Sequence, residues 1–191
     1  MKIVFATGNS HKVEEIQTIL KGYQLIGLAD IGCHEEIPET NPTIKGNALQ
    51  KARYVVENYN VINCFAEDTG LEVDALNGEP GVYSARYAGS EKDADANIHK
   101  VLAKLANYPD RAAQFRTVVA LILEGEEYTF EGIIRGHIKT EKSGSGGFGY
   151  DPVFVPEGET RTFAEMSAEE KNKISHRARA VLLLKSFLEN R

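Results

Sequence analysis

Residues 3–20, IVFATGNSHKVEEIQTIL, decide the fold class of this chain. The apolar run Ile3–Ala6 predicts a buried strand, and Thr7-Gly8-Asn9 predicts the turn that ends it. The next apolar residues recur at helical spacing, at Val13, Ile16, Ile19 and Leu20. A strand, a glycine turn and a helix in this order are typical of the opening of an α/β protein.

The rest of the chain continues this pattern without a repeat or a composition break that would mark a linker. Thr43 and the pair Ser167/Glu170 have the spacing of helix N-terminal caps, and the second cap opens a helical stretch that ends at residues 181–184. Further elements are predicted as strands at 23–28 and 61–66, a helix from about 93 to 105, and a hairpin of 115–123 and 128–138. We therefore predict an α/β fold, a mixed sheet with helices on both sides, in a single domain over residues 1–191.

Composition limits the possible functions. The 191 residues are 42% hydrophobic and 26% charged, which is ordinary for one globular domain. A net charge of −6 argues against a protein that coats nucleic acid polymers. Cys33 and Cys64 fit no metal or disulfide pattern and are expected to be free thiols. The start of the chain resembles neither a signal peptide nor a membrane span, so we expect a cytoplasmic protein without a membrane partner.

The turn Thr7-Gly8-Asn9-Ser10-His11-Lys12 is the first candidate for chemistry. A glycine turn between a strand and a helix gathers backbone N–H groups at a helix N-terminus, which favours an anion. Lys12 adds a positive charge in the first helical turn. The alternative is a capped helix that carries a surface lysine, since such caps are common.

Acidic residues are the second candidate. Glu67 and Asp68 follow the predicted strand at 61–66, where α/β proteins place catalytic and metal-binding groups. Glu39 lies with other acids in the preceding loop. Carboxylates from two segments suit Mg²⁺, which prefers oxygen ligands. The alternative is a solvated acidic turn.

Two later stretches combine aromatic and charged side chains. Phe148 and Tyr150 alternate with glycines, which suggests flat faces on which a planar ring stacks, with Asp151 as a hydrogen-bond acceptor. The alternative is a loop whose aromatic rings pack in the core. Lys171, with His176 and Arg177, suits phosphate or carbonyl recognition, and the alternative is a solvated helix face.

Together these pieces resemble the Ham1-like family of inosine/xanthosine triphosphate pyrophosphatases. The motifs that carry the resemblance are ATGNSHK (6–12), ETNPTIKGNALQKA (39–52), FAEDTGLEVDALNGEPGVYSARYAG (65–89), GGFGYDPVFVPEG (146–158) and EEKNKISHRARA (169–180). The resemblance implies two lobes around a central nucleotide cleft, and usually a homodimer. It also implies that purine nucleoside triphosphates are hydrolysed to the monophosphate and pyrophosphate with Mg²⁺.

The resemblance also implies roles for single residues. Glu39 and Asp68 would bind Mg²⁺, with Asp68 also the base for the attacking water. The other positions would contact the substrate, through its phosphates or its base: Thr7, Gly8, Asn9, Ser10, His11, Lys12, Lys51, Thr69, Phe148, Gly149, Tyr150, Asp151, Lys171, His176 and Arg177.

Two positions depart from the family pattern. Gly46 stands where the family often has a glutamate, and Glu67 where many members have an aspartate. The first departure puts the metal geometry in doubt if that glutamate supports the metal. Two other functions stay open, a pyrophosphatase of modified pyrimidine nucleotides on a similar fold and a nucleotide-binding sensor without turnover. Loss of an acid at position 39 or 68 would indicate the sensor, and both acids are present.

Overall fold

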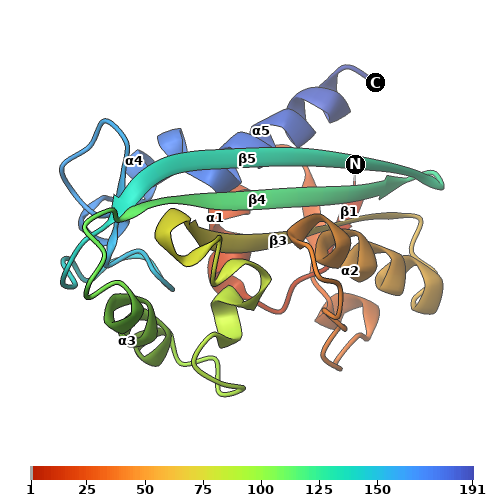
Figure 1. Ribbon diagram of the computed structural model, residues 1–191. Coiled ribbons are helices and arrows are strands. Elements are labelled where there is room, and N and C mark those ends of the chain that lie inside the picture. The colour runs from red at the N-terminus through yellow and green to blue at the C-terminus, as the bar shows by residue number, and fades with distance from the viewer. Residues whose placement is uncertain (1) are drawn as a thin grey trace. The chain divides into compact units, whose positions relative to one another are not determined.

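The computed structural model describes residues 2–191, in which helices and strands alternate along most of the chain (Figure 1). The elements in chain order are β1 (Lys2–Phe5), α1 (Ser10–Ile19), β2 (Gln24–Ile26), α2 (Ile44–Asn58), β3 (Asn63–Val73), α3 (Ala94–Lys104), β4 (Ala112–Leu123), β5 (Glu126–Ile138), β6 (Phe154–Pro156), α4 (Ala168–Ile174) and α5 (His176–Glu189). Short 3₁₀ turns, such as Gly81–Arg86, lie between them.

The strands of residues 2–191 form one six-stranded sheet in the order β2-β1-β3-β4-β5-β6. β1 pairs in parallel with both β2 and β3, so that Val4 lies opposite Ile26 on one side and Cys64 on the other. β5 and β6 pair antiparallel. The sheet is therefore mixed, as the sequence predicts.

Two compact units divide the chain. The first unit comprises Met1–Asp68, Thr117–Gly132 and Arg177–Arg191, and the second comprises Thr69–Arg116 and Ile133–His176. The boundaries fall inside β3, β4 and β5, so each of these strands contributes residues to both units.

In the first unit, helices pack on both faces of the strands. Ile3 and Phe5 of β1 share a core with Val181 and Leu184 of α5. Successive strand residues point to opposite faces, so Val4 points away from that core. Figure 1 shows α2 and α5 on opposite sides of the long strands. The buried residues of α2 recur at helical spacing, at Ile44, Asn47, Ala48, Lys51, Ala52 and Val55.

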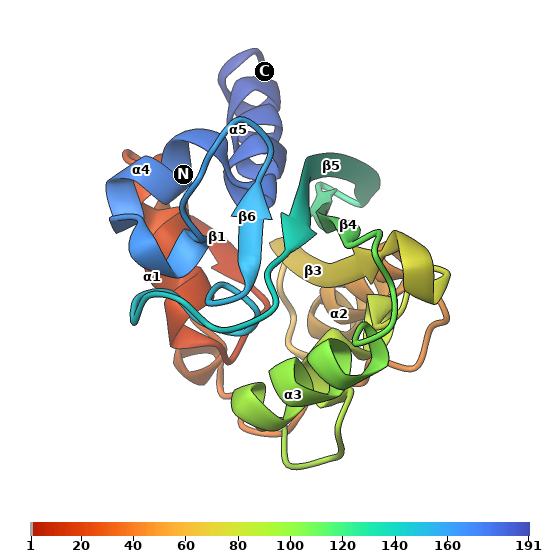
Figure 2. The same cartoon turned by 60° about the vertical axis from the view of Figure 1, so that its left-hand side comes forward.

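The second unit has a core of its own, built around Phe115 of β4. The Phe115 ring lies 4.7 Å from that of Phe154 and 6.2 Å from that of Phe163, centroid to centroid. Ile98 and Val101 of α3 belong to the same core, and Figure 2 labels α3, β6 and α4 of this unit.

Several local predictions are confirmed. Thr43 caps α2, and Ser167 and Glu170 form a capping box at the start of α4. The hairpin of β4 and β5 turns at Glu124 and Gly125, which both have positive φ (53° and 87°). This left-handed conformation matches the twist of a two-residue hairpin turn.

Two local predictions are wrong, and one strand is not predicted from the sequence. β3 does not end before Glu67 but continues to Val73, and its last part is buried because Leu71 and Val73 belong to the core of the second unit. The C-terminal helical stretch is two helices, since Ser175 has an extended conformation between α4 and α5. β6 has only three residues, too few to show a period in the sequence.

Both cysteines, Cys33 and Cys64, are buried free thiols, as expected from the sequence. Within residues 2–191, every helix is too short or too polar to cross a lipid bilayer.

Candidate active site

The turn after β1 is built by short polar side chains. The Thr7 hydroxyl accepts a hydrogen bond from the Asn9 backbone N–H (3.2 Å), and Asn9 Oδ1 accepts one from the Lys12 N–H (3.3 Å). Asn9 is therefore the N-cap of α1, and Ser10 begins the helix. Gly8, Ser10 and His11 are exposed, so this turn is open to an anion.

Lys51 is the centre of a charged cluster in the first unit. It projects from α2, and its ammonium group donates a short hydrogen bond to Glu39 Oε1. The same ammonium lies 3.5 Å from Asp68 Oδ1. Lys51 therefore brings together two carboxylates, from the loop before α2 and from β3, that the sequence predicts as one site.

The electrostatics of this cluster favour a proton acceptor at Asp68. Burial raises the pKa of Asp68, and Glu39 adds to this effect while Lys51 opposes it. Burial lowers the pKa of Lys51, but the neighbouring Asp68 and Glu39 outweigh burial and the pKa is raised. Asp68 Oδ2 is buried and accepts no hydrogen bond from residues 2–191. This oxygen is thus available to a water, a metal or a substrate group.

Glu67, the neighbour of Asp68, has a different environment. Its carboxylate is fully buried and contacts Lys12 Nζ at 2.7 Å and Arg177 Nη2 at 3.4 Å. Arg177 Nη1 also contacts Glu15 at 2.6 Å. Burial alone would raise the pKa of Glu67, but Arg177 and Lys12 outweigh it and hold this pKa well below its usual range. Glu67 is therefore an anion at neutral pH.

The glycine loop, residues 142–149, belongs to the second unit and is bound there by the Asp151 carboxylate. Asp151 Oδ2 accepts hydrogen bonds from the Phe148 N–H (2.9 Å) and from Lys171 Nζ (2.7 Å). A Cβ on Gly147, which has φ +69°, would lie 2.2 Å from the same oxygen. Glycine is therefore required where the loop crosses Asp151.

The aromatic residues of this region have unequal exposure. Phe148 is half-buried, and the Lys171 ammonium lies 4.7 Å from its ring centroid. Tyr150 belongs to the core, and its hydroxyl donates to the Ser84 backbone carbonyl at 2.8 Å. The His176 ring is buried and stacks on Phe115, with centroids 4.5 Å apart.

The structure thus gathers the sequence-predicted residues into two groups. Lys12, Lys51, Glu39, Asp68 and Arg177 lie in the first unit, together with the turn after β1. The glycine-loop residues, Lys171 and His176 lie in the second unit, as does half-buried Thr69.

Sequence reasoning missed three residues of the first unit. Glu15 pairs with Arg177, and its position three residues after Lys12 on α1 is the only local signal, because residues at that spacing share a helix face. Gln50 and Asn47 of α2 bind the loop beyond Glu39. Both amides lie within the motif at residues 39–52, in which only Glu39 and Lys51 were predicted as site residues.

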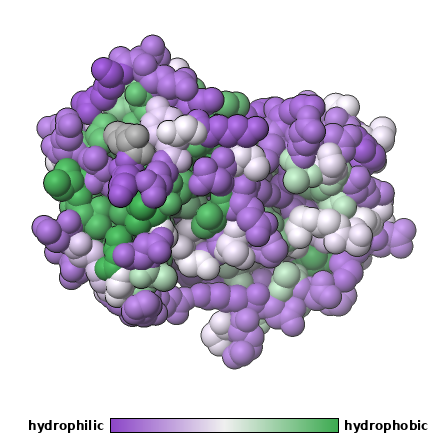
Figure 3. All heavy atoms as spheres, turned by 180° about the vertical axis from the view of Figure 1, so that it is seen from behind, coloured by the Kyte–Doolittle hydropathy of each residue, from purple (hydrophilic) through white to green (hydrophobic). Residues whose placement is uncertain are grey.

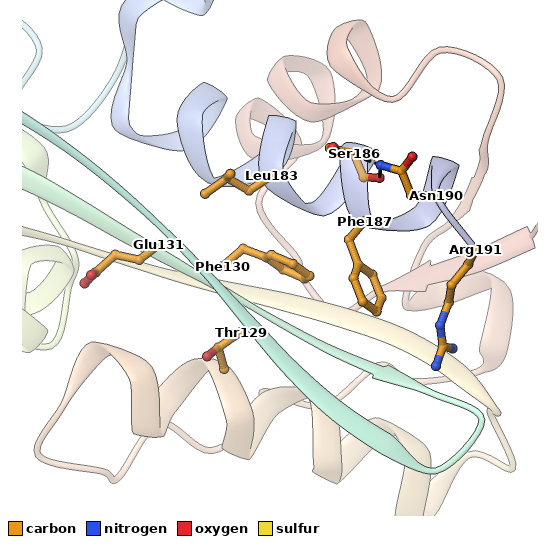
Figure 4. Close-up of a pocket in the computed structure, with 8 residues that line it drawn as sticks. All are labelled: Thr129, Phe130, Glu131, Leu183, Ser186, Phe187, Asn190 and Arg191. Carbon is orange, nitrogen blue, oxygen red and sulfur yellow. Dashed lines mark hydrogen bonds between the residues drawn. The ribbon is translucent and has the colours of Figure 1, made fainter.

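An apolar groove lies elsewhere in the first unit, between β5 and α5. Figure 4 shows Phe130 and Phe187 pointing into it, with ring centroids 5.4 Å apart. Its volume is about 630 Å³, and none of the sequence-predicted site residues lines it. Apolar side chains also gather on one part of the surface in Figure 3, and Leu182 and Leu183 of α5 are half-exposed. The groove lacks charged groups for phosphate chemistry apart from Glu131 and Arg191 at its lining.

The chain is similar over nearly its whole length to known proteins. The chain is 57% identical over 189 residues to a dITP/XTP pyrophosphatase of Porphyromonas gingivalis, covering 98% of this chain and 97% of the relative. It is 54% identical to a protein of the same name from Flavobacterium johnsoniae, covering 98% of both chains.

Solved structures give the same result. The Ham1 protein of Staphylococcus aureus matches with a TM-score of 0.91 and 42% identity, covering 100% of this chain and 99% of that one. The HAM1 protein of Coxiella burnetii matches with a TM-score of 0.92 and 37% identity, and both chains are covered in full. The Ham1 family model matches residues 3–187, and the chain belongs to the Ham1 family.

Proposed function

We propose that this protein hydrolyses deaminated purine nucleoside triphosphates, dITP, ITP and XTP, to the monophosphate and pyrophosphate. This reaction would remove them from the nucleotide pool. Relatives that match nearly the whole chain are named dITP/XTP pyrophosphatases, which supports the substrate class. The observation that carries the proposal is the cluster of Lys51 with Glu39 and Asp68, because it combines phosphate-binding charge with a proton acceptor.

The donor set at Lys51 fits Mg²⁺. Glu39 and Asp68 would hold the ion, since both carboxylates lie at one ammonium group. Residues 2–191 contain no group of three His, Cys, Asp or Glu side chains close enough together to hold a metal without other ligands. Two protein carboxylates are enough for Mg²⁺, because it usually keeps several waters and takes substrate phosphates as its other ligands. When bound, it supplies positive charge to the polyphosphate.

The chain's own residues would perform the rest of the chemistry. Lys12, Lys51 and the N–H groups of the turn at residues 7–12 would hold the phosphates and stabilise charge on the leaving pyrophosphate. Asp68 would accept the proton of the attacking water at Oδ2 as the anhydride bond between the α- and β-phosphates breaks. A raised pKa supports this role, because a base with a higher pKa takes a proton more readily.

Hydrogen bonds from polar side chains would decide which nucleobase the protein accepts. Hypoxanthine and xanthine present a carbonyl and a ring N–H where adenine presents an amino group and a bare nitrogen. We propose that Phe148 stacks on the base, and that Asp151, Lys171, His176 and Arg177 surround the base and phosphates. Each buried group that a wrong base leaves unpaired costs about 1–3 kcal/mol, so two mismatches give roughly a hundredfold or more.

We further propose that the protein acts in the cytoplasm as a homodimer, without nucleic acid polymers or membranes as partners. The negative net charge supports the exclusion of nucleic acid polymers.

A substrate panel tests the proposed function. Values of kcat/KM for ITP, XTP and dITP should exceed those for ATP, GTP and the pyrimidine triphosphates. A preference for modified pyrimidine nucleotides would replace the proposed substrate class. Binding of ITP without any turnover would instead indicate a nucleotide sensor.

A further inference from the structure

The loop that carries Glu39 is fastened to α2 by one side chain. Gln50 Oε1 accepts hydrogen bonds from the Thr40 backbone N–H (2.9 Å) and from Asn41 Nδ2 (3.0 Å). Gln50 Nε2 donates to the Thr40 hydroxyl (2.9 Å). The two residues that follow Glu39 are thus held by three hydrogen bonds to a single amide.

A second amide of α2 supports the same loop. Asn47 is buried, and its Oδ1 accepts a hydrogen bond from the Asn41 N–H at 2.8 Å. Asn41 in turn lies over Gly46, where a Cβ would come within 2.8 Å of Asn41 Cβ and Oδ1. The absence of a side chain at Gly46 therefore lets the loop lie directly on the first turn of α2.

Gln50 and Lys51 are consecutive residues that bind neighbouring parts of the same loop. Lys51 binds the Glu39 carboxylate, and Gln50 binds the backbone one residue further along the chain. Lys51 also reaches Asp68. One turn of α2 therefore binds both the Glu39 carboxylate and the backbone that follows Glu39, and Lys51 keeps that carboxylate near Asp68.

We propose that Gln50 is a positioning residue that holds Glu39 ready to receive the divalent cation. The inference rests on the proposed function, which makes Glu39 a ligand. Glu39 lies on an irregular segment between Gly32 and α2, and ordering a free loop at the moment of binding would cost conformational entropy. The amide offers both the acceptor and the donor that this loop uses, whereas an ionised glutamate only accepts and methionine has no donor.

The test compares Gln50→Met with Arg53→Met. Arg53 lies on the same helix. Within residues 2–191 its guanidinium bonds Glu127, at 2.6 and 2.7 Å, and not the loop that carries Glu39, so its loss leaves that loop intact. The first measurement is amide hydrogen exchange at Thr40 in metal-free protein. The second is the Mg²⁺ concentration that gives half-maximal ITP hydrolysis at saturating ITP.

We expect Gln50→Met to accelerate exchange at Thr40 and to raise the half-activating Mg²⁺ concentration by about 10- to 100-fold, with kcat at saturating Mg²⁺ largely restored. Arg53→Met should change neither. Thr40→Val removes only the hydroxyl that Gln50 donates to, so it should give a smaller change in the same direction and serves if Gln50→Met unfolds.

Each other result overturns the inference. Unchanged exchange at Thr40 would mean that the Gln50 bonds do not hold the loop. Faster exchange with an unchanged Mg²⁺ requirement would make Gln50 structural only. If the wild type hydrolyses ITP fully without a divalent cation, the metal part of the proposed function fails, and the inference fails with it.

Discussion

Glu67 and Asp68 are neighbours on β3, yet their carboxylates have opposite electrostatic environments. Glu67 is neutralised by two cations, so its proton is already lost and its oxygens are occupied. Asp68 keeps one buried oxygen without a hydrogen-bond donor from residues 2–191, and burial raises its pKa. A reacting water therefore finds its acceptor at Asp68, while Glu67 serves to orient Lys12 and Arg177.

Asp68→Asn tests the base directly. The amide cannot accept a proton, so kcat for ITP should fall by at least about a hundredfold. The fold should survive, because the change removes a carboxylate that burial disfavours. The measurements are kcat and the midpoint of thermal unfolding. Near-normal turnover in this variant would instead make Glu39 or Glu67 the base.

Glu67→Gln should lower the free energy of unfolding. Removing one member of a buried ion pair strands its partners and costs about 3–5 kcal/mol at neutral pH. The pKa of Glu67 is lowered in the folded protein, so its stabilisation is complete above the unfolded pKa of about 4.3 and is lost as pH falls below that value. The difference between wild type and variant should therefore shrink from pH 7 to pH 3.5.

Denaturant unfolding at both pH values measures this difference. Glu127→Gln is the matched control, because its pair with Arg53 is partly exposed and is worth no more than about 1 kcal/mol. Equal losses in the two variants at pH 7 would show that the Glu67 network is not a strong buried pair.

At the scale of elements, the first turn of α2 shows how a single missing side chain shapes the site. The Asn41 side chain occupies the space beside Gly46, where a Cβ would come within 2.8 Å of it. The loop that follows Glu39 therefore packs directly on the first turn of α2.

Gly46→Ala distinguishes packing from helix propensity. In an exposed helix this change stabilises by up to about 1 kcal/mol. Here the new Cβ would lie 2.8 Å from Asn41, so we expect a loss of about 1–3 kcal/mol from overpacking. Unfolding of the double variant with Asn41→Gly should show a loss smaller than the sum of the single losses. A stabilised Gly46→Ala protein would contradict the close contact.

Elements with strong local signals could be predicted from the sequence. The caps Thr43 and Ser167 and the turn at Gly125 each satisfy backbone groups within a few residues, so the sequence alone predicts them. The length of β3 depends on its neighbours in the sheet, and no window around Asp68 contains those neighbours.

The site follows the same division. The residues that meet at Lys51 were recognisable through a family resemblance and through their acidic character. Their geometry was not, because Glu39 and Asp68 are 29 positions apart along the chain and meet only through the fold. Gln50 and Glu15 could not be predicted either, since a glutamine or a glutamate on a helix surface is ordinary.

At the scale of the whole molecule, the two units differ in what they contribute. The first unit holds the paired charges around Lys51 and Glu67, and the second holds Phe148 and the Asp151–Lys171 pair. We therefore expect chemistry to depend on the first unit and stacking to depend on Phe148.

Phe148→Ala tests this division of roles. Loss of a stacking ring should weaken all purine triphosphates by about 1–3 kcal/mol, because every base has a π-face. The values of kcat/KM for ITP and ATP should therefore fall by the same factor and leave their ratio nearly unchanged. Phe148→Tyr keeps the ring and should stay close to wild type. A collapse of the ratio in Phe148→Ala would mean that Phe148 itself selects the base.

Phosphorus-31 NMR during ITP hydrolysis identifies the bond that breaks. Asp68→Asn protein, purified in the same way, reports any contaminating phosphatase. Cleavage between the α- and β-phosphates predicts IMP and pyrophosphate as the first products, in equal amounts and without IDP at any time. IDP and orthophosphate as the initial products would contradict the proposed reaction.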